Sequence, residues 1–183
     1  MRKVVLYIAS SLDGYIADID GSVSWIEGDG TEPMAKGTYG KFIETVDTVI
    51  LGYNTYRQIV EELSPDKWVY EGLKTYVITH RNIESSGDIV FTKDSVSELV
   101  AALKKENGKD IWICGGASIV NQLLDSGLIE TLKITVVPRI LGGGIPLFKP
   151  NNKIMKLKLL SVENYNGFVE STYQILSTAA SME

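Results

Sequence analysis

The stretch Cys114-Gly115-Gly116-Ala117-Ser118 decides how this chain folds, because it joins two unlike segments. Residues 109–114 before it form a short apolar run typical of a buried strand, and residues 118–126 after it carry apolar side chains at helical spacing. The glycine pair therefore predicts a strand-to-helix elbow. Such an elbow lets a ligand approach the free N–H groups of the helix, although a tight turn without a ligand is the alternative for a single pair.

The same alternation of strand and helix runs through the first two-thirds of the chain, and strands dominate afterwards. The pattern predicts strands over residues 3–9, 48–51, 75–79, 89–91, 111–114, 132–137, 156–165 and 168–176, and helices over residues 35–44, 55–63, 96–107 and 118–126. It is typical of an α/β protein with a central, mostly parallel mixed sheet, helices on both faces and antiparallel C-terminal strands. Asn166-Gly167 predicts a tight hairpin turn between the last two strands.

Composition and charge exclude several classes of function. The 183 residues suit one domain over residues 1–183, of which residues 177–183 are expected to fray. A net charge of -5, with Lys and Arg scattered along the chain, argues against a nucleic-acid partner. The single cysteine excludes an internal disulfide and a multi-cysteine metal site. Without a signal-like or membrane-spanning apolar segment, we expect a cytoplasmic protein that binds neither a membrane nor a metal.

Ligands of open α/β sheets bind beyond the carboxyl ends of the parallel strands. Most of the segments that follow the predicted strands are rich in glycine, hydroxyl groups or cations. These segments are residues 10–17, 52–56, 80–82 and 115–118. The sequence therefore favours a small-molecule site at this edge of the sheet.

Taken in order, these segments resemble the dihydrofolate reductase superfamily, especially the branch with the C-terminal reductase domain of the bifunctional riboflavin-biosynthesis deaminase/reductase. The resemblance covers nearly the whole chain. It is carried by residues 11–17 (SLDGYIA), 24–26 (SWI), 49–56 (VILGYNTY), 77–81 (VITHR), 113–117 (ICGGA) and 137–148 (VPRILGGGIPLF). It implies a dihydrofolate-reductase-like fold, a homodimer, and an NADPH-dependent oxidoreductase acting on a small heterocyclic substrate. The nearest named chemistry is that of 5-amino-6-(5-phosphoribosylamino)uracil reductase.

The resemblance also implies where NADPH binds. Gly115 and Gly116 would lie beside its nicotinamide and pyrophosphate, at a peptide bond for which the family implies an unusual cis form. Thr55 would meet the pyrophosphate, with Asn54 as the helix N-cap. Thr79 and Arg81 would hold the adenosine 2′-phosphate, because a guanidinium can donate two parallel hydrogen bonds to a phosphate. The other implied cofactor residues are Ala9, Ile16, Gly52, Ala117 and Ser118.

Two departures from the family pattern bear on function. Tyr53 stands where the usual Gly-Arg-x-Thr motif has arginine, which removes one cation from the phosphate end and weakens the expected preference for NADPH. The carboxylate that dihydrofolate reductases place on their first long helix falls near Thr38, and residues 35–43 contain no Asp or Glu. We therefore expect poor reduction of dihydrofolate.

Asp13 is the candidate catalytic and substrate-binding acid. It is either a turn former before Gly14 or a pocket carboxylate, whose pKa partial desolvation would raise enough to relay a proton or hold a ring N–H. Trp25 is either a stacking wall of the substrate pocket or a core residue. The alternative function is a non-catalytic NADP-binding or redox-sensing module, which Tyr53 and the missing helix acid favour and which the Asp13-Gly14 and Gly115-Gly116 pairs oppose.

Overall fold

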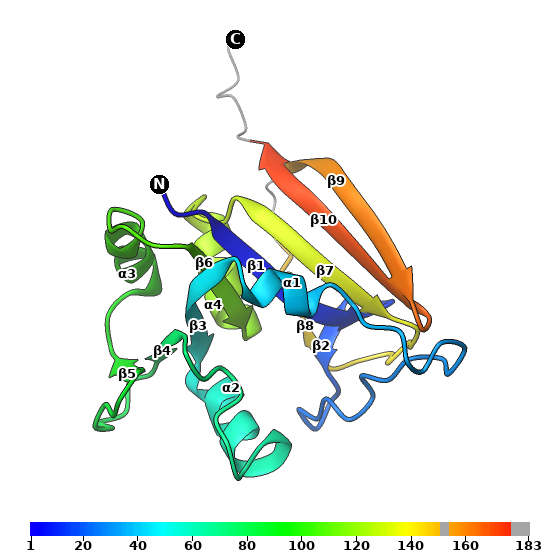
Figure 1. The fold of residues 1–183 in the computed structure, drawn as a ribbon, viewed down its shortest axis with the longest axis horizontal. Helices are drawn as coiled ribbons and strands as arrows, with labels where there is room; N and C mark the ends of the chain where they lie inside the picture. Colours follow the sequence, from blue (N-terminus) through cyan, green and yellow to red (C-terminus); the bar gives the residue numbers. More distant parts are fainter. Residues whose placement is uncertain (151–153, 177–183) are drawn as a thin grey trace.

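The computed structural model describes residues 1–150 and 154–176, so the fraying expected for residues 177–183 lies outside the described residues. Its main sheet has eight strands in the order β5-β4-β3-β6-β1-β7-β10-β9 (Figure 1). These strands are β1 (Val4–Ser11), β3 (Val46–Gly52), β4 (Lys74–Ile78), β5 (Ile89–Thr92), β6 (Asp110–Gly115), β7 (Thr131–Val137), β9 (Lys156–Tyr165) and β10 (Phe168–Leu176). Two short strands, β2 (Tyr15–Ala17) and β8 (Ile145–Pro146), pair separately.

The strand directions confirm the expected mixed sheet. Strand β1 runs parallel to β6 and β7, β3 runs parallel to β4 and β6, and β4 runs parallel to β5. Strand β10 is antiparallel to both β7 and β9. The turn between β9 and β10 has positive φ at Asn166 (47°) and Gly167 (77°), as a two-residue hairpin turn matching the strand twist requires.

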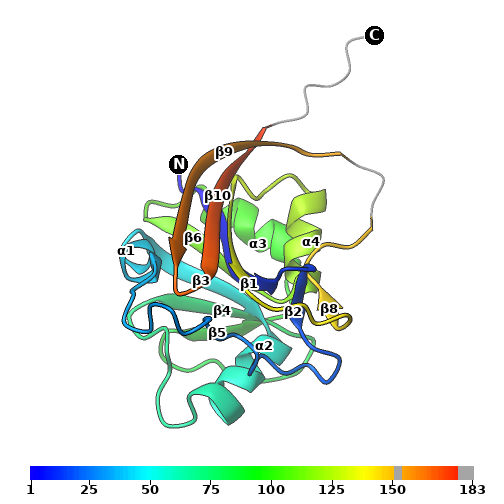
Figure 2. The same ribbon diagram turned by 90° about the vertical axis from the view of Figure 1, so that its right-hand side faces the viewer.

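Helices cover both faces of the parallel part of the sheet (Figure 2). They are α1 (Tyr39–Ile43), α2 (Tyr53–Gln58), the π-helical turn η1 (Ile59–Leu63), α3 (Val96–Leu103) and α4 (Ala117–Asp125). Side chains of β1 alternate between the two cores: Val4 and Leu6 pack with α3 and α4, while Val5 and Tyr7 pack on the face of α1 and η1. This two-sided burial explains why the parallel strands read as continuous apolar runs.

The helices differ from expectation where tertiary contacts override local propensity. The helix expected over residues 35–44 is reduced to α1, because the preceding segment packs against the β9–β10 turn. A Cβ on Gly37 would lie 2.4 Å from the ring of Tyr165, so only glycine allows this approach. The backbone of this segment is also tied to the turn by the Asp29 N–H, which donates to the Asn166 carbonyl at 3.0 Å.

No helix among the described residues is long and apolar enough to cross a membrane.

Candidate active site

The predicted strand-to-helix elbow is present between β6 and α4. Gly115 ends the strand with a φ of 123°, a conformation that residues with a side chain rarely adopt, and the Gly115–Gly116 peptide bond is cis. A Cβ on Gly115 would also come within 3.2 Å of Ile8 Cδ1. Gly116, by contrast, has a φ of -77° and serves as the N-cap of α4. The conformational need for glycine therefore lies at Gly115.

The carboxyl end of β3 lies directly beside this elbow, since Leu51 pairs with Gly115. A Cβ on Gly52 would lie 3.8 Å from the Gly116 nitrogen, and a Cβ on Gly116 would lie 3.6 Å from Thr55 Oγ1. The structure thus brings Gly52, Thr55, Gly115 and Gly116 together at the elbow. The absence of side chains at the three glycines leaves the backbone there uncovered by a Cβ.

The expected N-cap role of Asn54 is wrong. Helix α2 begins at Tyr53 and its N-cap is Gly52, with no side-chain hydrogen bond at the cap. The helix starts immediately after the strand, so Asn54 falls within its first turn and is exposed. The N-terminus of α2 is therefore capped without Asn54.

The segment after β4 places Arg81 against α2. Buried Thr79 accepts a hydrogen bond from the Arg81 N–H at 3.1 Å, and its own N–H donates to the Thr92 carbonyl at 2.9 Å. The Arg81 guanidinium carbon lies 4.7 Å from the centre of the Tyr53 ring, within the range of a cation–π contact. Tyr53, which stands where the motif of the resembled family has arginine, therefore contacts the guanidinium of Arg81.

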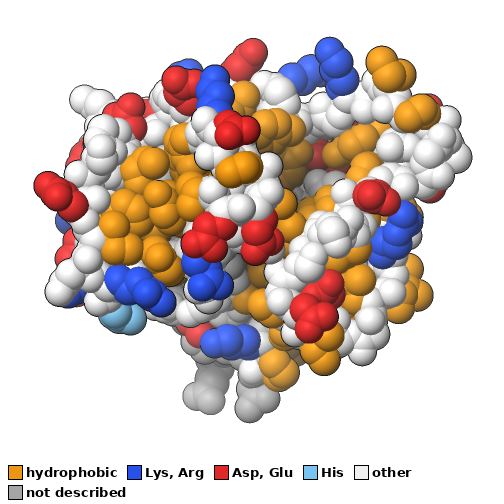
Figure 3. Space-filling view, turned by 90° about the horizontal axis from the view of Figure 1, so that it is seen from below, with side chains coloured by type: hydrophobic (Ala, Val, Ile, Leu, Met, Phe, Trp, Pro, Cys, Tyr) orange, Lys and Arg blue, Asp and Glu red, His pale blue; other side chains and the backbone are white. Residues whose placement is uncertain are grey.

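Viewed from below, the surface has hydrophobic side chains gathered among acidic and basic groups (Figure 3).

The remaining predicted cofactor residues lie on three different elements, β1, β2 and α4. Ala9 is near the end of β1, paired with Thr135 of β7, and Ile16 lies in β2, packed against the core under α4. Ala117 opens α4 and Ser118 follows it on the exposed side. Ala117 and Ser118 therefore adjoin the elbow through the chain.

Trp25 is half-buried in the segment between β2 and α1. Its indole N–H donates to the Ser22 carbonyl at 3.0 Å. Among the described residues it belongs to neither of the two hydrophobic core clusters. The core interpretation of Trp25 is therefore not supported.

Of the two settings expected for Asp13, the structure does not show the desolvated pocket carboxylate. Its carboxylate is exposed and accepts hydrogen bonds from the Ser11 hydroxyl at 2.6 Å and from the backbone N–H groups of Leu141 and Gly142 at 3.1 and 2.8 Å. These donors, the Ser11 hydroxyl first, lower the pKa of Asp13 to about 2. The predicted rise in its pKa is wrong, because these hydrogen bonds outweigh the desolvation that acts in the opposite direction. Asp13 ties the turn at Gly14 to the glycine-rich loop after β7.

Sequence reasoning missed a buried carboxylate, Glu170 of β10, which is 1% exposed. It accepts hydrogen bonds from the hydroxyls of Tyr7 at 2.6 Å and Thr135 at 3.2 Å, and its Oε1 lies 2.9 Å from Lys133 Nζ. The hydroxyls of Thr38 and Tyr165 also donate to it. Burial acts to raise the pKa of Glu170, but hydrogen bonds from Thr38, Tyr7 and Lys133 outweigh it and leave the pKa lowered.

The sheet register places this carboxylate on the same sheet face as Ala9. Ala9 pairs with Thr135, and Thr135 pairs with Glu170, so the three side chains share one face of the sheet. Thr38, at the position of the missing helix acid, contacts this same carboxylate. The sequence shows Glu170 only as one polar residue in a strand of alternating polar and apolar residues. Its burial becomes evident only from the pairing of β1, β7 and β10.

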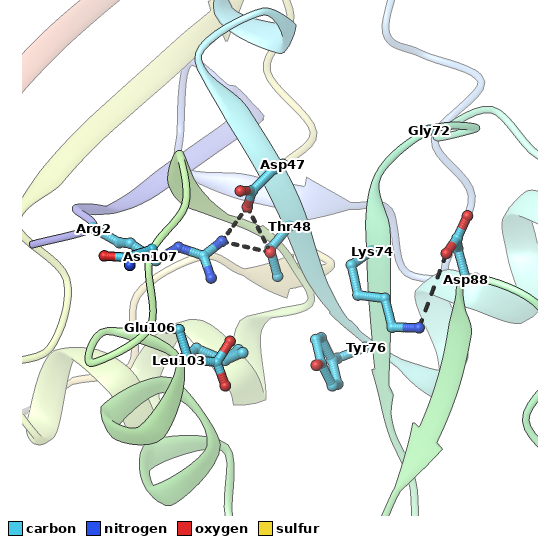
Figure 4. A pocket seen from close by; sticks show the side chains of 10 residues that line it. All are labelled: Arg2, Asp47, Thr48, Gly72, Lys74, Tyr76, Asp88, Leu103, Glu106 and Asn107. Atoms are coloured by element: carbon cyan, nitrogen blue, oxygen red, sulfur yellow. Dashed lines mark hydrogen bonds and ion pairs between the residues drawn. The ribbon is translucent and has the colours of Figure 1, made fainter.

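A polar cavity of about 370 Å³ lies away from the elbow, at the amino ends of β3 and β4 (Figure 4). Buried Arg2 lines it and donates to Thr48 Oγ1 and to the Lys109 carbonyl, each at 2.6 Å, and it also pairs with Asp47. Because the guanidinium already has these partners, Arg2 is not available to bind a ligand in this cavity. In the described part of the chain, no group of three or more His, Cys, Asp or Glu side chains is arranged to hold a metal.

Solved structures agree with this geometry. The chain superimposes on a Shewanella sp. PV-4 protein provisionally named a riboflavin biosynthesis protein with a TM-score of 0.80 and 26% identity, covering 95% of this chain and 99% of that one. Dihydrofolate reductase from Enterococcus faecalis, solved with NADP(H), gives a TM-score of 0.60 at 18% identity, covering 94% and 96% of the two chains. The fold is therefore dihydrofolate-reductase-like.

Sequence comparison identifies the family. The chain is 40% identical over 173 residues to the uncharacterized protein YwjB of Bacillus subtilis (strain 168), covering 94% of this chain and 97% of YwjB. It is 28% identical over 156 residues to the riboflavin biosynthesis protein RibD of Corynebacterium ammoniagenes, covering 78% of this chain and 44% of that protein. The model of the RibD C-terminal domain matches residues 2–169. This chain therefore belongs to the RibD C-terminal domain family.

Proposed function

We propose that this protein is an NADPH-dependent oxidoreductase that reduces a small heterocyclic substrate, with chemistry nearest to that of 5-amino-6-(5-phosphoribosylamino)uracil reductase. One observation carries the proposal. Gly52, Gly115 and Gly116 meet at the carboxyl ends of two adjacent parallel strands, where the backbone carries no side chain that would keep a ligand away. This is the edge of an open α/β sheet at which ligands bind.

The residues at this junction fit a pyrophosphate. The Thr55 hydroxyl lies 3.6 Å from where a Cβ of Gly116 would stand, so it adjoins the uncovered backbone as a hydrogen-bond donor. Helix α4 begins here with Ala117 and Ser118, and its first N–H groups and positive dipole end favour an anion. When bound, NADPH supplies the hydride. The protein itself would hold the phosphates of NADPH at this junction, and its glycines would leave the backbone of the elbow accessible to the cofactor.

The cation for the 2′-phosphate is Arg81 in this proposal. Tyr53 orients its guanidinium through the ring contact, and Thr79 fixes the backbone of residue 81. A guanidinium held in this way loses less conformational freedom on binding a phosphate than a free side chain would. The tyrosine therefore compensates in part for the cation that the arginine of the family motif would have provided.

Asp13 and Trp25 remain part of the proposed substrate site, with Asp13 in a changed role. At neutral pH the Asp13 carboxylate holds no proton to donate, since its pKa is lowered to about 2. We assign it the positioning of residues 141 and 142 beside β2 and β8. Trp25 would form a wall for the substrate ring. Ala9 and Ile16 would border the cofactor, and Asn54 would contact it from the exposed side of α2.

Cofactor titration tests the proposal. The unmutated protein should bind NADPH more tightly than NADH, and Arg81→Ala should remove most of the difference, because a charge-assisted hydrogen bond is worth roughly 1.5 to 3 kcal/mol, or about one to two decades in affinity. Quenching of tryptophan fluorescence measures both constants. Arg57→Ala is the matched control, since Arg57 is an exposed arginine of α2, the helix that carries Tyr53, and pairs only with Glu61 at 3.8 Å among the described residues.

Two results would contradict the proposal or change it. Equal affinities for the two cofactors in the unmutated protein would remove the role assigned to Arg81. NADPH binding without oxidation by any member of a panel of pyrimidine and pteridine substrates would favour the non-catalytic NADP-binding module instead.

We also propose that the protein is a homodimer, formed through the C-terminal strands. Strands β9 and β10 extend beyond the helices (Figure 1), and Leu157, Leu159 and Val162 of β9 are 43%, 52% and 52% exposed. Leu159 pairs with Tyr173 and Leu157 with Ile175, so these leucines continue the apolar face of the sheet that α3 and α4 cover elsewhere. A ten-residue edge strand with an exposed apolar face is well suited to pair with a second copy.

A further inference from the structure

The Lys133 ammonium of β7 is held in place but retains hydrogen-bonding capacity. Its Nζ lies 2.9 Å from Glu170 Oε1 and 5.1 Å from the centre of the Tyr7 ring, and 15% of its side chain is exposed. An ammonium has three donors. Among the described residues, Glu170 is the one carboxylate paired with it, so further N–H groups are free to meet an acceptor.

Glu170 is in the opposite situation. Its two carboxylate oxygens already accept from four hydroxyls and from Lys133, which uses the roughly four lone-pair positions of a carboxylate. The group is also 1% exposed, so a ligand cannot approach it without displacing a partner. Of the two charges of this pair, only the cation can therefore bind a substrate.

The register puts the pair on the same sheet face as Ala9, which borders the cofactor in the proposed function. Lys133 pairs with Tyr7 of β1 and lies two residues before Thr135, which pairs with Ala9. Lys133 and Ala9 thus share one face of the sheet, roughly 7 Å apart along the strand direction. The extended side chain of a lysine spans this distance.

We propose that Lys133, positioned by Glu170, is the substrate-binding cation of this site, and that it selects rings presenting a carbonyl or anionic oxygen over rings presenting a protonated amidine. The inference rests on the proposed reductase function and specifies its substrate class. A partly exposed ammonium facing a carbonyl or anionic oxygen makes a charge-assisted hydrogen bond. An amidinium would face the same ammonium with no free carboxylate, and like charges at this distance disfavour binding.

Binding of two small probe rings tests this selectivity. Barbiturate presents anionic and carbonyl oxygens, and 2,4-diaminopyrimidine presents an amidine. Calorimetric titration of the full chain, with and without NADP⁺, should show tighter binding of barbiturate. Lys133→Met should weaken barbiturate binding about ten- to hundredfold, without weakening that of 2,4-diaminopyrimidine. Lys158→Met is the control, because Lys158 is an exposed lysine of neighbouring β9.

Two further variants of Lys133 separate the effect of its charge from an effect on folding. Lys133→Arg retains the cation and should retain the preference for barbiturate. If Lys133→Met does not fold, Lys133→Gln, which keeps a donor toward Glu170 but carries no charge, should show the same loss. Tighter binding of 2,4-diaminopyrimidine by the unmutated chain, binding of neither ring, or barbiturate binding that does not depend on Lys133 would each overturn the inference.

The outcomes also separate the two proposals. If barbiturate binds through Lys133 but neither NADPH nor NADH binds, the reductase proposal fails while the cation site stands. If NADPH binds and is preferred over NADH but barbiturate binding is unchanged in Lys133→Met, the cofactor assignment stands and the role of Lys133 fails.

Discussion

Replacing Glu170 by glutamine removes one buried charge while keeping the shape of the side chain. The Tyr7 and Thr135 hydroxyls can rotate and still find a partner, so the main loss is the counter-charge of Lys133. Breaking a buried ion pair in this way costs about 3–5 kcal/mol, because the other charge stays behind unpaired. Since 15% of the Lys133 side chain remains exposed, we expect the lower end, about 3 kcal/mol.

This loss is large enough to measure by two independent methods. Urea unfolding followed by circular dichroism should show the fall in the free energy of unfolding. The melting temperature should fall by about 6–12 °C, because each kcal/mol shifts it by roughly 2–4 °C in a chain of this size. Glu163→Gln is the control: Glu163 is exposed on β9 and pairs across the strands with Glu170, so its change should stay within about 0.5 kcal/mol.

A double-mutant cycle identifies the ion pair as the cause. Lys133→Met combined with Glu170→Gln removes the unpaired ammonium, so the double variant should be more stable than Glu170→Gln alone, with a coupling of at least about 1 kcal/mol. The stabilisation should also depend on pH. The pKa of Glu170 is lowered in the folded state, so its contribution is complete above the unfolded value of about 4.3 and is lost as pH falls through the folded value. A loss below about 1 kcal/mol at neutral pH, or additive effects in the cycle, would refute the reasoning.

Other expectations concern the loops, the elbow, the substrate and the assembly. Asp13→Asn should speed amide hydrogen exchange at residues 141 and 142 and leave the pH dependence of NADPH oxidation unchanged; an ionisation lost from that profile would restore the proton-relay interpretation. Gly116→Val should abolish NADPH binding with an unchanged circular dichroism spectrum, because its methyl groups would approach Thr55, and retained binding would make the elbow purely structural. The unmutated chain should reduce dihydrofolate poorly, and efficient turnover would contradict the substrate assignment. Leu159→Glu should convert a dimer to a monomer in light scattering at micromolar concentration, whereas a monomeric unmutated protein would refute the dimer.

The features that could be predicted are those that local sequence determines. Apolar runs buried on two faces defined the parallel strands, and Asn166-Gly167 defined the hairpin turn. The Gly115-Gly116 elbow could be found because a strand pattern changes to a helix pattern across it. Each of these signals spans only a few neighbouring residues.

The features that could not be predicted depend on contacts between distant segments. The pKa of Asp13 is lowered first by the neighbouring Ser11 hydroxyl and then by the backbone N–H groups of residues 141 and 142, which the turn pattern around Asp13 does not reveal. Glu170 becomes internal only through the register of β1, β7 and β10. Arg81 and Tyr53 meet only because β3 and β4 are neighbours in the sheet.

The β9–β10 turn connects two parts of the molecule that have separate proposed roles. Asn166 accepts hydrogen bonds from Asp29 and Gly30, and its own N–H donates to Glu32, so the turn holds the segment that leads to Thr38 and the buried carboxylate. The same turn ends the strands whose apolar face we expect a second subunit to cover. Association at those strands would stiffen a segment bordering the substrate site, so ligand affinity should rise with protein concentration over the range in which subunits assemble.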